Sequence, residues 1–339
     1  MEYNRKQYRT GKNRKIREKK LLFYGLFCAS IVFLFACLEG CGVNELENQA
    51  FPLAMGVEAQ DNDTMNLYLA YPNLQDEKAS KNALSSDVFW EGEVSDLFAG
   101  MRQMSENSNK NPDLNHLKVL ILSPKVIVRE DALEAVLSFF EKEPDAAWNT
   151  YVLLTEEPMQ QIFSEGIQLP ECMGIYLEDL LEEWEHVKDS AFVTVGTLMQ
   201  QFYGAEEMMC IPKLSLQEGT LNISGFFMLY QMKIAGNLSL QEGYEALLLQ
   251  NKMREYEFQM KDGTGVMVEQ LKTHKVESVT PKIIVKGSFG ITNHMEGSQK
   301  SQNVKAQAKR ELESRLQTFA RRWQQMCTEE SKKVQVVVE

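Results

Sequence analysis

Cys41 is the residue whose type and position could carry chemistry, because it closes the sequence Leu38-Glu39-Gly40-Cys41 directly after a long apolar run. Bacterial lipoprotein signals end in Leu, a small residue, Gly or Ala, and then the Cys whose thiol receives a diacylglyceryl group. Glu39 stands where this pattern has a small residue. A carboxylate costs much less near the bilayer interface than at mid-bilayer, so Glu39 weakens the signal without removing it. We therefore predict lipid attachment at Cys41, with an uncleaved membrane helix as the alternative.

The segment before Cys41 has the composition of an export signal. Residues 21–38 contain no charged residue, and residues 1–20 contain nine Lys and Arg. A basic stretch followed by an apolar one is typical of a secretory signal, or of an anchor whose basic end stays in the cytoplasm. At about 1.5 Å per residue the apolar run reaches roughly 27 Å, which is enough to span a hydrocarbon core. We predict that residues 1–40 are a lipoprotein-type signal sequence and that the body is exported.

Other patterns that could carry chemistry are sparse. The four histidines are His116, His186, His274 and His294, and none lies at metal-ligand spacing from another His or a Cys. We interpret His116 as a structural residue before a buried strand, and His186 and His274 as solvent-facing residues. The sequence also lacks nucleophile elbows, Walker loops and GxGxxG turns. We therefore expect no catalytic residue, no cofactor and no metal site.

Two adjacent acidic pairs, Glu156 with Glu157 and Glu182 with Glu183, could in principle serve as general acid and base. The chain has 48 acidic and 36 basic residues, so such pairs lie on solvent-facing surfaces by default. Its net charge of −12 becomes more negative once the basic segment at residues 1–20 is removed. An acidic body repels phosphate backbones, so we expect no nucleic-acid partner.

A cationic stretch near the C-terminus allows two interpretations. Arg310, Arg315, Arg321 and Arg322 lie in "KRELESRLQTFARRW", where apolar residues recur every three or four positions. The arginines could bind an acidic partner or lipid headgroups. They could also form the cationic outer face of an otherwise buried helix, and we prefer this second interpretation.

The elements expected from periodicity indicate two domains. Residues 51–71 predict two strands joined by a hairpin, and the chain up to residue 165 then alternates between helices and buried strands, which is typical of a layered α/β domain. We expect residues 170–205 to be helical. The predicted domains after the signal are residues 41–205 and residues 206–339.

The predicted C-terminal domain is a mainly antiparallel sheet with a long helix packed on it. A hairpin is expected in "TLNISGFFMLYQMKIAGNLS", and Ser239 with Glu242 forms a capping-box pattern that begins a helix. Alternating strands follow, and then one long helix at residues 301–327. The expected fold class is α+β or mixed α/β, with several lobes of β-sheet backed by helices.

The order of these motifs resembles the Ger(x)C family, the lipoprotein C subunits of the spore germinant receptors of endospore-forming bacteria. The stretch "GCGVNELENQAFPLAMGVEA" keeps the Gly-Cys, the Glu-Leu and the apolar run, but it lacks the Trp-Asp that the family has there. "HLKVLIL" and "GFFMLYQMKIAGNLSLQEGYEALLLQNK" are similar to interior segments of the family, and "VESVTPKIIVKGSFGI" and the long helix follow in the expected order. The resemblance covers about residues 38–327.

The resemblance implies a function as well as a fold. It implies a non-enzymatic lipoprotein subunit of a germinant receptor, required for nutrient-triggered germination and anchored through acylated Cys41. The implied location is the outer face of the spore inner membrane, and the implied partners are the bilayer and two integral-membrane receptor subunits. Family members continue past the long helix with a further strand, which "KVQVVVE" could supply here. The alternative is an extracytoplasmic solute-binding lipoprotein that feeds a transporter, and this would require a ligand cleft.

Overall fold

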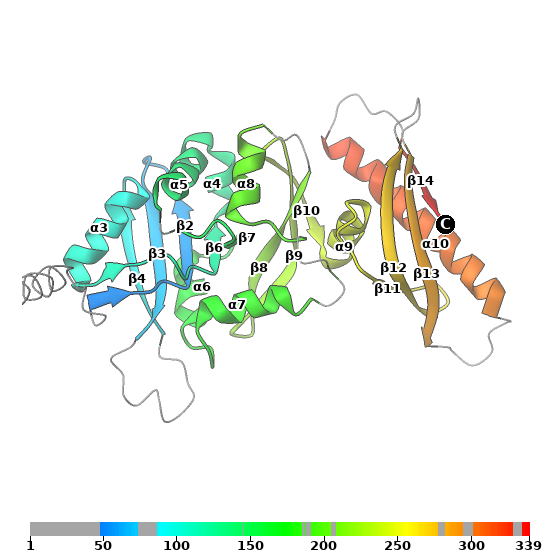
Figure 1. The fold of residues 1–339 in the computed structure, drawn as a ribbon, viewed down its shortest axis with the longest axis horizontal. Helices are drawn as coiled ribbons and strands as arrows, with labels where there is room; N and C mark the ends of the chain where they lie inside the picture. Colours follow the sequence, from blue (N-terminus) through cyan, green and yellow to red (C-terminus); the bar gives the residue numbers. More distant parts are fainter. Residues whose placement is uncertain are drawn as a thin grey trace, which may run out of the picture. The chain divides into compact units, whose positions relative to one another are not determined.

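The structure, a computed structural model, describes residues 48–73, 87–144, 146–184, 187, 191–204, 208–276, 282–293, 301–327 and 334–339. Residues 49–339 form one compact unit. In the described part of this unit the strands form an eight-stranded sheet, a four-stranded sheet and a short two-stranded pair, with helices packed against them (Figure 1). The expected mixture of β-sheet backed by helices is confirmed.

The eight-stranded sheet has the order β10-β9-β8-β7-β6-β2-β3-β4. Its central strands β8, β7, β6 and β2 run parallel, and antiparallel pairs extend the sheet on both sides. The predicted hairpin near residue 60 is the β2–β3 pair, and the predicted hairpin after residue 219 is the β9–β10 pair. The strands are β2 (Ala54–Ala59), β3 (Met65–Pro72), β4 (Asp87–Val94), β6 (Val119–Leu122), β7 (Tyr151–Leu154), β8 (Met209–Gln217), β9 (Thr220–Tyr230) and β10 (Lys233–Ser239). The separate pair is β1 (Gln49–Ala50) with β5 (Asn111–Pro112).

Both faces of the central strands are buried, which explains their short apolar sequences. Successive side chains of a strand point to opposite faces. In β6, Val119 and Ile121 accordingly belong to one hydrophobic cluster, and Leu120 and Leu122 belong to the other. The helices that contribute to the Leu120 cluster are α3 (Leu97–Ser108), α4 (Pro124–Val128), α5 (Glu130–Lys142) and α8 (Val195–Phe202). The helices that contribute to the Val119 cluster include α6 (Met159–Gly166), α7 (Met173–Glu182) and α9 (Leu240–Leu249).

The four-stranded sheet has the order β11-β12-β13-β14 and is packed against the long helix α10 (Ser301–Cys327). The strands are β11 (Tyr256–Gln259), β12 (Gly265–Val276), β13 (Lys282–Asn293) and β14 (Gln335–Val338). The first three are antiparallel, and β14 lies parallel to β13. Residues of α10 at intervals of three or four are buried, including Val304, Ala308, Leu312, Leu316 and Phe319. The long helix, the mainly antiparallel sheet and the last strand from "KVQVVVE" are confirmed.

Helix α9 connects the two sheets through their cores. It begins with the expected capping box between Ser239 and Glu242. Its buried residues Ala246 and Leu247 belong to a hydrophobic cluster that contains Phe226 of β9 as well as Leu316 of α10. One continuous core therefore serves both sheets.

The prediction of helix over residues 170–205 is wrong in the middle of that range. The structure has two separate helices, α7 and α8, and α8 begins at its own capping box between Thr194 and Thr197. Just before this box the chain runs beside β7, where the backbone N–H of Val152 donates to the carbonyl of Val193 at 2.9 Å. The polar Thr-x-x-Thr sequence ends the extended segment and begins a new helix.

The eight-stranded sheet runs across the domain boundary predicted between residues 205 and 206. β8, β9 and β10 follow that boundary in sequence, yet they continue the sheet that β7 belongs to. A parallel strand after a helical crossover extends an existing sheet more readily than it starts a new one. The division of the chain into domains stays a prediction.

Candidate functional site

The predicted lipid-attachment residue, Cys41, lies outside the described residues, together with the whole predicted signal at residues 1–40 and with His186 and His294. Within the ranges that are described, no helix has both the length and the apolar composition to cross a bilayer. The same ranges contain no group of three or more His, Cys, Asp and Glu able to hold a metal ion.

The two described histidines lie on the surface. His116 is exposed just before β6, and its ring centroid is 5.9 Å from that of Phe51 in an edge-on arrangement. His274 is exposed on β12, as expected from the alternation of that strand.

The acidic pairs lie at opposite ends of β7 and do not meet. Glu156, just after the strand, forms an ion pair with Lys213 and accepts a hydrogen bond from Asn237 Nδ2 at 3.3 Å. The hydrogen bond from Lys213 lowers the pKa of the Glu156 carboxyl. Glu182, at the end of α7, is 3.5 Å from the hydroxyl of Tyr151, the first residue of β7. The arrangement gives no acid and base facing one another.

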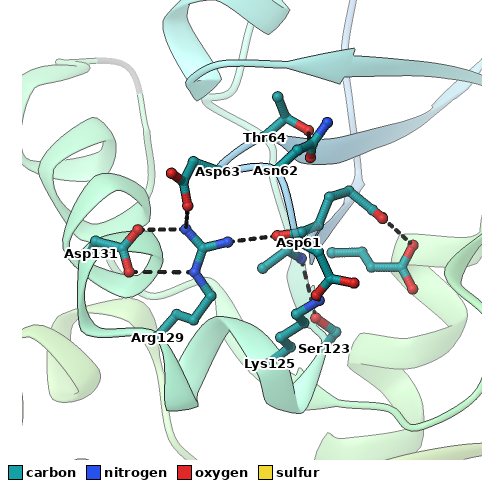
Figure 2. Close-up of polar contacts among 11 residues, drawn as sticks. Asp61, Asn62, Asp63, Thr64, Ser123, Lys125, Arg129 and Asp131 are labelled. Atoms are coloured by element: carbon teal, nitrogen blue, oxygen red, sulfur yellow. Dashed lines mark hydrogen bonds and ion pairs between the residues drawn. The ribbon is translucent and has the colours of Figure 1, made fainter.

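A group of five charged residues, here called the turn cluster, lies at the carboxyl end of β2 and β6, where open α/β sheets commonly bind ligands. It consists of Asp61, Asp63, Lys125, Arg129 and Asp131 (Figure 2). Arg129 donates to the carbonyl of Gln60 at 2.6 Å, to Asp63 Oδ1 at 2.9 Å and to Asp131 Oδ2 at 2.5 Å. Lys125 forms an ion pair with Asp61.

These contacts indicate that the turn cluster has a structural role. The hydrogen bond from Arg129 lowers the pKa of Asp131, and the hydrogen bond from Lys125 lowers the pKa of Asp61. Each of the five charges therefore already has an opposite charge beside it. The cluster fixes the β2–β3 turn to α4 and α5 and offers no free charge to a ligand.

Three exposed aromatic residues form a second feature, here called the aromatic surface: Phe98 (42% exposed), Trp148 (55%) and Tyr203 (60%). All three are held by consecutive residues at the end of α5. The ring centroids of Phe98 and Phe139 are 4.8 Å apart, Trp148 Nε1 donates to the carbonyl of Phe140 at 3.3 Å, and the Tyr203 hydroxyl is 3.3 Å from Glu141 Oε2. The three aromatic residues belong to helices α3, α5 and α8 or lie near their ends. All three helices contribute to one hydrophobic cluster.

A third feature is a cavity of about 570 Å³ beside α10, here called the α10 cavity. It contains three of the four arginines singled out in the sequence. Arg315 pairs with Glu311 at 2.8 Å and lies 5.2 Å from the centre of the Phe258 ring, and Arg322 pairs with Glu242. The lining residues are Glu242, Glu245, Lys261, Gln307, Arg310, Glu311, Ser314, Arg315, Thr318, Phe319 and Arg322.

One of the acids that line the α10 cavity is buried. Glu245 is only 6% exposed, and its burial raises the pKa of its carboxyl, with the nearby Arg315 acting in the opposite direction. Burial likewise raises the pKa of the neighbouring Tyr256 hydroxyl. Sequence reasoning missed Glu245 and Lys261, since the only signal for Glu245 was an acidic residue on the apolar face of α9.

Comparison with known proteins gives two matches. Residues 42–216 match the sequence profile of the family described as the spore germination protein N-terminal domain. The chain is also similar to the crystal structure of the GerBC protein, with 16% sequence identity over 83% of this chain and 85% of that one, at a TM-score of 0.46. Comparison with the curated proteins finds no match.

Proposed function

Because the chain belongs to this spore germination protein family, we propose that it is the lipoprotein C subunit of a spore germinant receptor and acts through protein contacts without catalysing a reaction. The observation that carries the proposal is the family match over residues 42–216. The match begins at residue 42, directly after Cys41, which would be the first residue of a processed lipoprotein.

The proposed anchor is a diacylglyceryl group on the Cys41 thiol. A single acyl chain holds a protein on a membrane only marginally, whereas two chains give a stable anchor. This anchor would keep the body on the outer face of the spore inner membrane, beside the two integral-membrane subunits that we propose as its partners.

The aromatic surface supports a role in protein contacts. Tyr, Trp and Phe are enriched at protein interfaces, and Trp and Tyr are frequent among the residues that contribute most to binding. Here Phe98, Trp148 and Tyr203 are exposed but fixed by α5, so a partner would bind side chains that are already ordered. We propose that this surface contacts one of the membrane subunits.

The anchor is tested by Cys41→Ser, with Cys37→Ser, in the apolar run just before it, as the matched control. We expect the Cys41→Ser body to lose the diacylglyceryl mass and to impair nutrient-triggered germination, and the control to behave as the natural chain. Intact mass of the membrane-extracted protein and germination of spores are the measurements. Normal germination by a Cys41→Ser chain without lipid would contradict the anchor.

The contact surface is tested by Trp148→Ala, with Val276→Ala as a control at an exposed apolar residue of β12. We expect Trp148→Ala to fold normally but to recover less of the membrane subunits on affinity purification from spore membranes. Equal recovery by Trp148→Ala and by a Phe98→Ala/Trp148→Ala double variant would rule out this surface as the contact.

A further inference from the structure

The charges that line the α10 cavity divide into paired and unpaired groups. Arg315 forms an ion pair with Glu311 along α10, and Arg322 of α10 forms an ion pair with Glu242 of α9. The side chains of Lys261 and Arg310 form no ion pair or hydrogen bond within the part of the chain that the structure describes. Lys261 and Arg310 are therefore two exposed cations of the cavity lining that have no partner in this part of the chain.

The position of Lys261 is fixed by its backbone. Its N–H donates to Glu311 Oε1 at 3.0 Å, which holds the end of β11 against α10 one residue from Arg310. Glu311 is held in turn by Arg315, which also donates to the carbonyl of Gln259. The backbone positions that carry the two cations are therefore held in place by these hydrogen bonds. Groups that are ordered before binding lose less entropy when a ligand binds between them.

The electrostatics of this cavity differ from those of the chain as a whole. The chain carries a net charge of −12, yet four cations and three acids line the cavity. Glu245 forms no ion pair within the described residues, and burial raises the pKa of its carboxyl, with Arg315 and the hydrogen bond to Gln241 acting in the opposite direction. A volume of about 570 Å³ falls within the range of small-molecule sites, which is roughly 300–1,000 Å³.

We propose that the α10 cavity binds a small organic carboxylate, held by Lys261 and Arg310. Arg and Lys bind carboxylates through short charge-assisted hydrogen bonds. The acids Glu242, Glu245 and Glu311 line the same cavity and would repel a doubly charged phosphate more strongly than a single carboxylate. The concave shape favours a soluble molecule over the flat surface of a membrane.

This inference goes beyond the proposed receptor role and does not depend on it, because binding is measured on the isolated protein. The full chain in detergent is titrated by calorimetry with lactate and with pyruvate, which each carry a single carboxylate. We expect saturable binding of at least one of them, and a loss of affinity of about tenfold or more in the Lys261→Gln/Arg310→Gln variant, since each cation contributes charge-assisted hydrogen bonds. Arg321→Gln is the matched control, because Arg321 is an exposed cation of the same helix that does not line the cavity.

Three results would overturn the proposal. The first is no saturable binding of either carboxylate to the natural chain. The second is equal weakening by Arg321→Gln, which would indicate a general effect of charge. The third is tighter binding of inorganic phosphate, or of vesicles containing phosphatidylglycerol, through Lys261 and Arg310, which would assign the cations to a phosphate ligand or to lipid headgroups. Circular dichroism checks that the variants fold, and Arg310→Lys, which keeps the charge, should retain more affinity than Arg310→Gln.

Discussion

Asp87 Oδ2 accepts a hydrogen bond from the backbone N–H of Met173 at 2.8 Å, so the first residue of β4 caps the N-terminus of α7. The side chain of the local cap residue, Cys172, makes no capping hydrogen bond. The Asp87 side chain is buried, and its Oδ1 has no hydrogen-bond partner among the described residues. A carboxylate from the edge strand thus replaces the cap that the sequence before α7 does not provide.

We expect Asp87→Ala to lower the free energy of unfolding by about 1 kcal/mol, within the range of about 0.5–2 kcal/mol seen for lost N-caps. Chemical denaturation would measure the change. Asp179→Ala is the control, because Asp179 is exposed on the same helix and has no capping position. Equal stability of Asp87→Ala and the natural chain would show that the bond to Met173 contributes nothing.

We expect Gly243→Ala to destabilise the fold, although alanine favours a helix by about 1 kcal/mol over glycine. A Cβ at this position of α9 would overlap the ring of Phe226, which is fully buried in β9. Overpacking of a core commonly costs about 1–3 kcal/mol, so the clash should exceed the gain in helix propensity. Gly290→Ala is the control, since its Cβ would meet only ordinary contact with Met267. A rise in the melting temperature of Gly243→Ala would show that α9 shifts to accommodate the methyl group.

We expect Glu245→Gln to remove a dependence of stability on pH. Burial raises the pKa of Glu245 above its ordinary value of 4.5, so within that interval the folded chain binds more protons than the unfolded chain. The stability of the natural chain should therefore fall as pH rises from 4.5 through the raised pKa, and the variant should lack this component. Denaturation over this pH range, with the exposed Glu269→Gln as control, measures the difference. Parallel stability curves for Glu245→Gln and the natural chain would contradict the raised pKa.

We expect Arg129→Ala to loosen the β2–β3 turn with little effect on global stability, since exposed ion pairs contribute little. Arg129 is the residue that holds the carbonyl of Gln60 and the carboxylates of Asp63 and Asp131. Hydrogen exchange should become faster at the amides of residues 60–64, and it should stay unchanged in the control Arg321→Ala. Unchanged exchange at the turn would show that Lys125 and Asp61 alone fix it.

The elements that the sequence predicted well are those set by neighbours along the chain. The period of buried residues in α10 and the Ser239–Glu242 capping box depend on contacts three or four positions apart, and both are confirmed. The alternation of β12 and the hairpin of β2 with β3 follow from equally local patterns.

The features that could not be predicted join residues far apart in sequence. Lys261 belongs to the α10 cavity only because Glu311 accepts its backbone N–H, and Asp87 caps α7 only because the sheet places β4 beside it. Arg322 is solvent-facing, as expected, but the sequence did not show that it also pairs with Glu242, whose other oxygen already caps α9. The periodicity of a single segment cannot predict these contacts, because each one joins two segments that are far apart in sequence.

The parallel centre of the eight-stranded sheet has a consequence for how fast the chain folds. Ala54 of β2 pairs with Val119 of β6, and Leu154 of β7 pairs with Lys213 of β8, so each pairing closes a long loop. Sheets dominated by such distant pairings fold slowly, because the entropy of loop closure is lost before the contacts form. Until β6 reaches β2 and β7, the apolar strands stay unpaired and prone to aggregation. Assembly of the sheet centre should therefore be the slow step of folding, and the step at which a chaperone would help most.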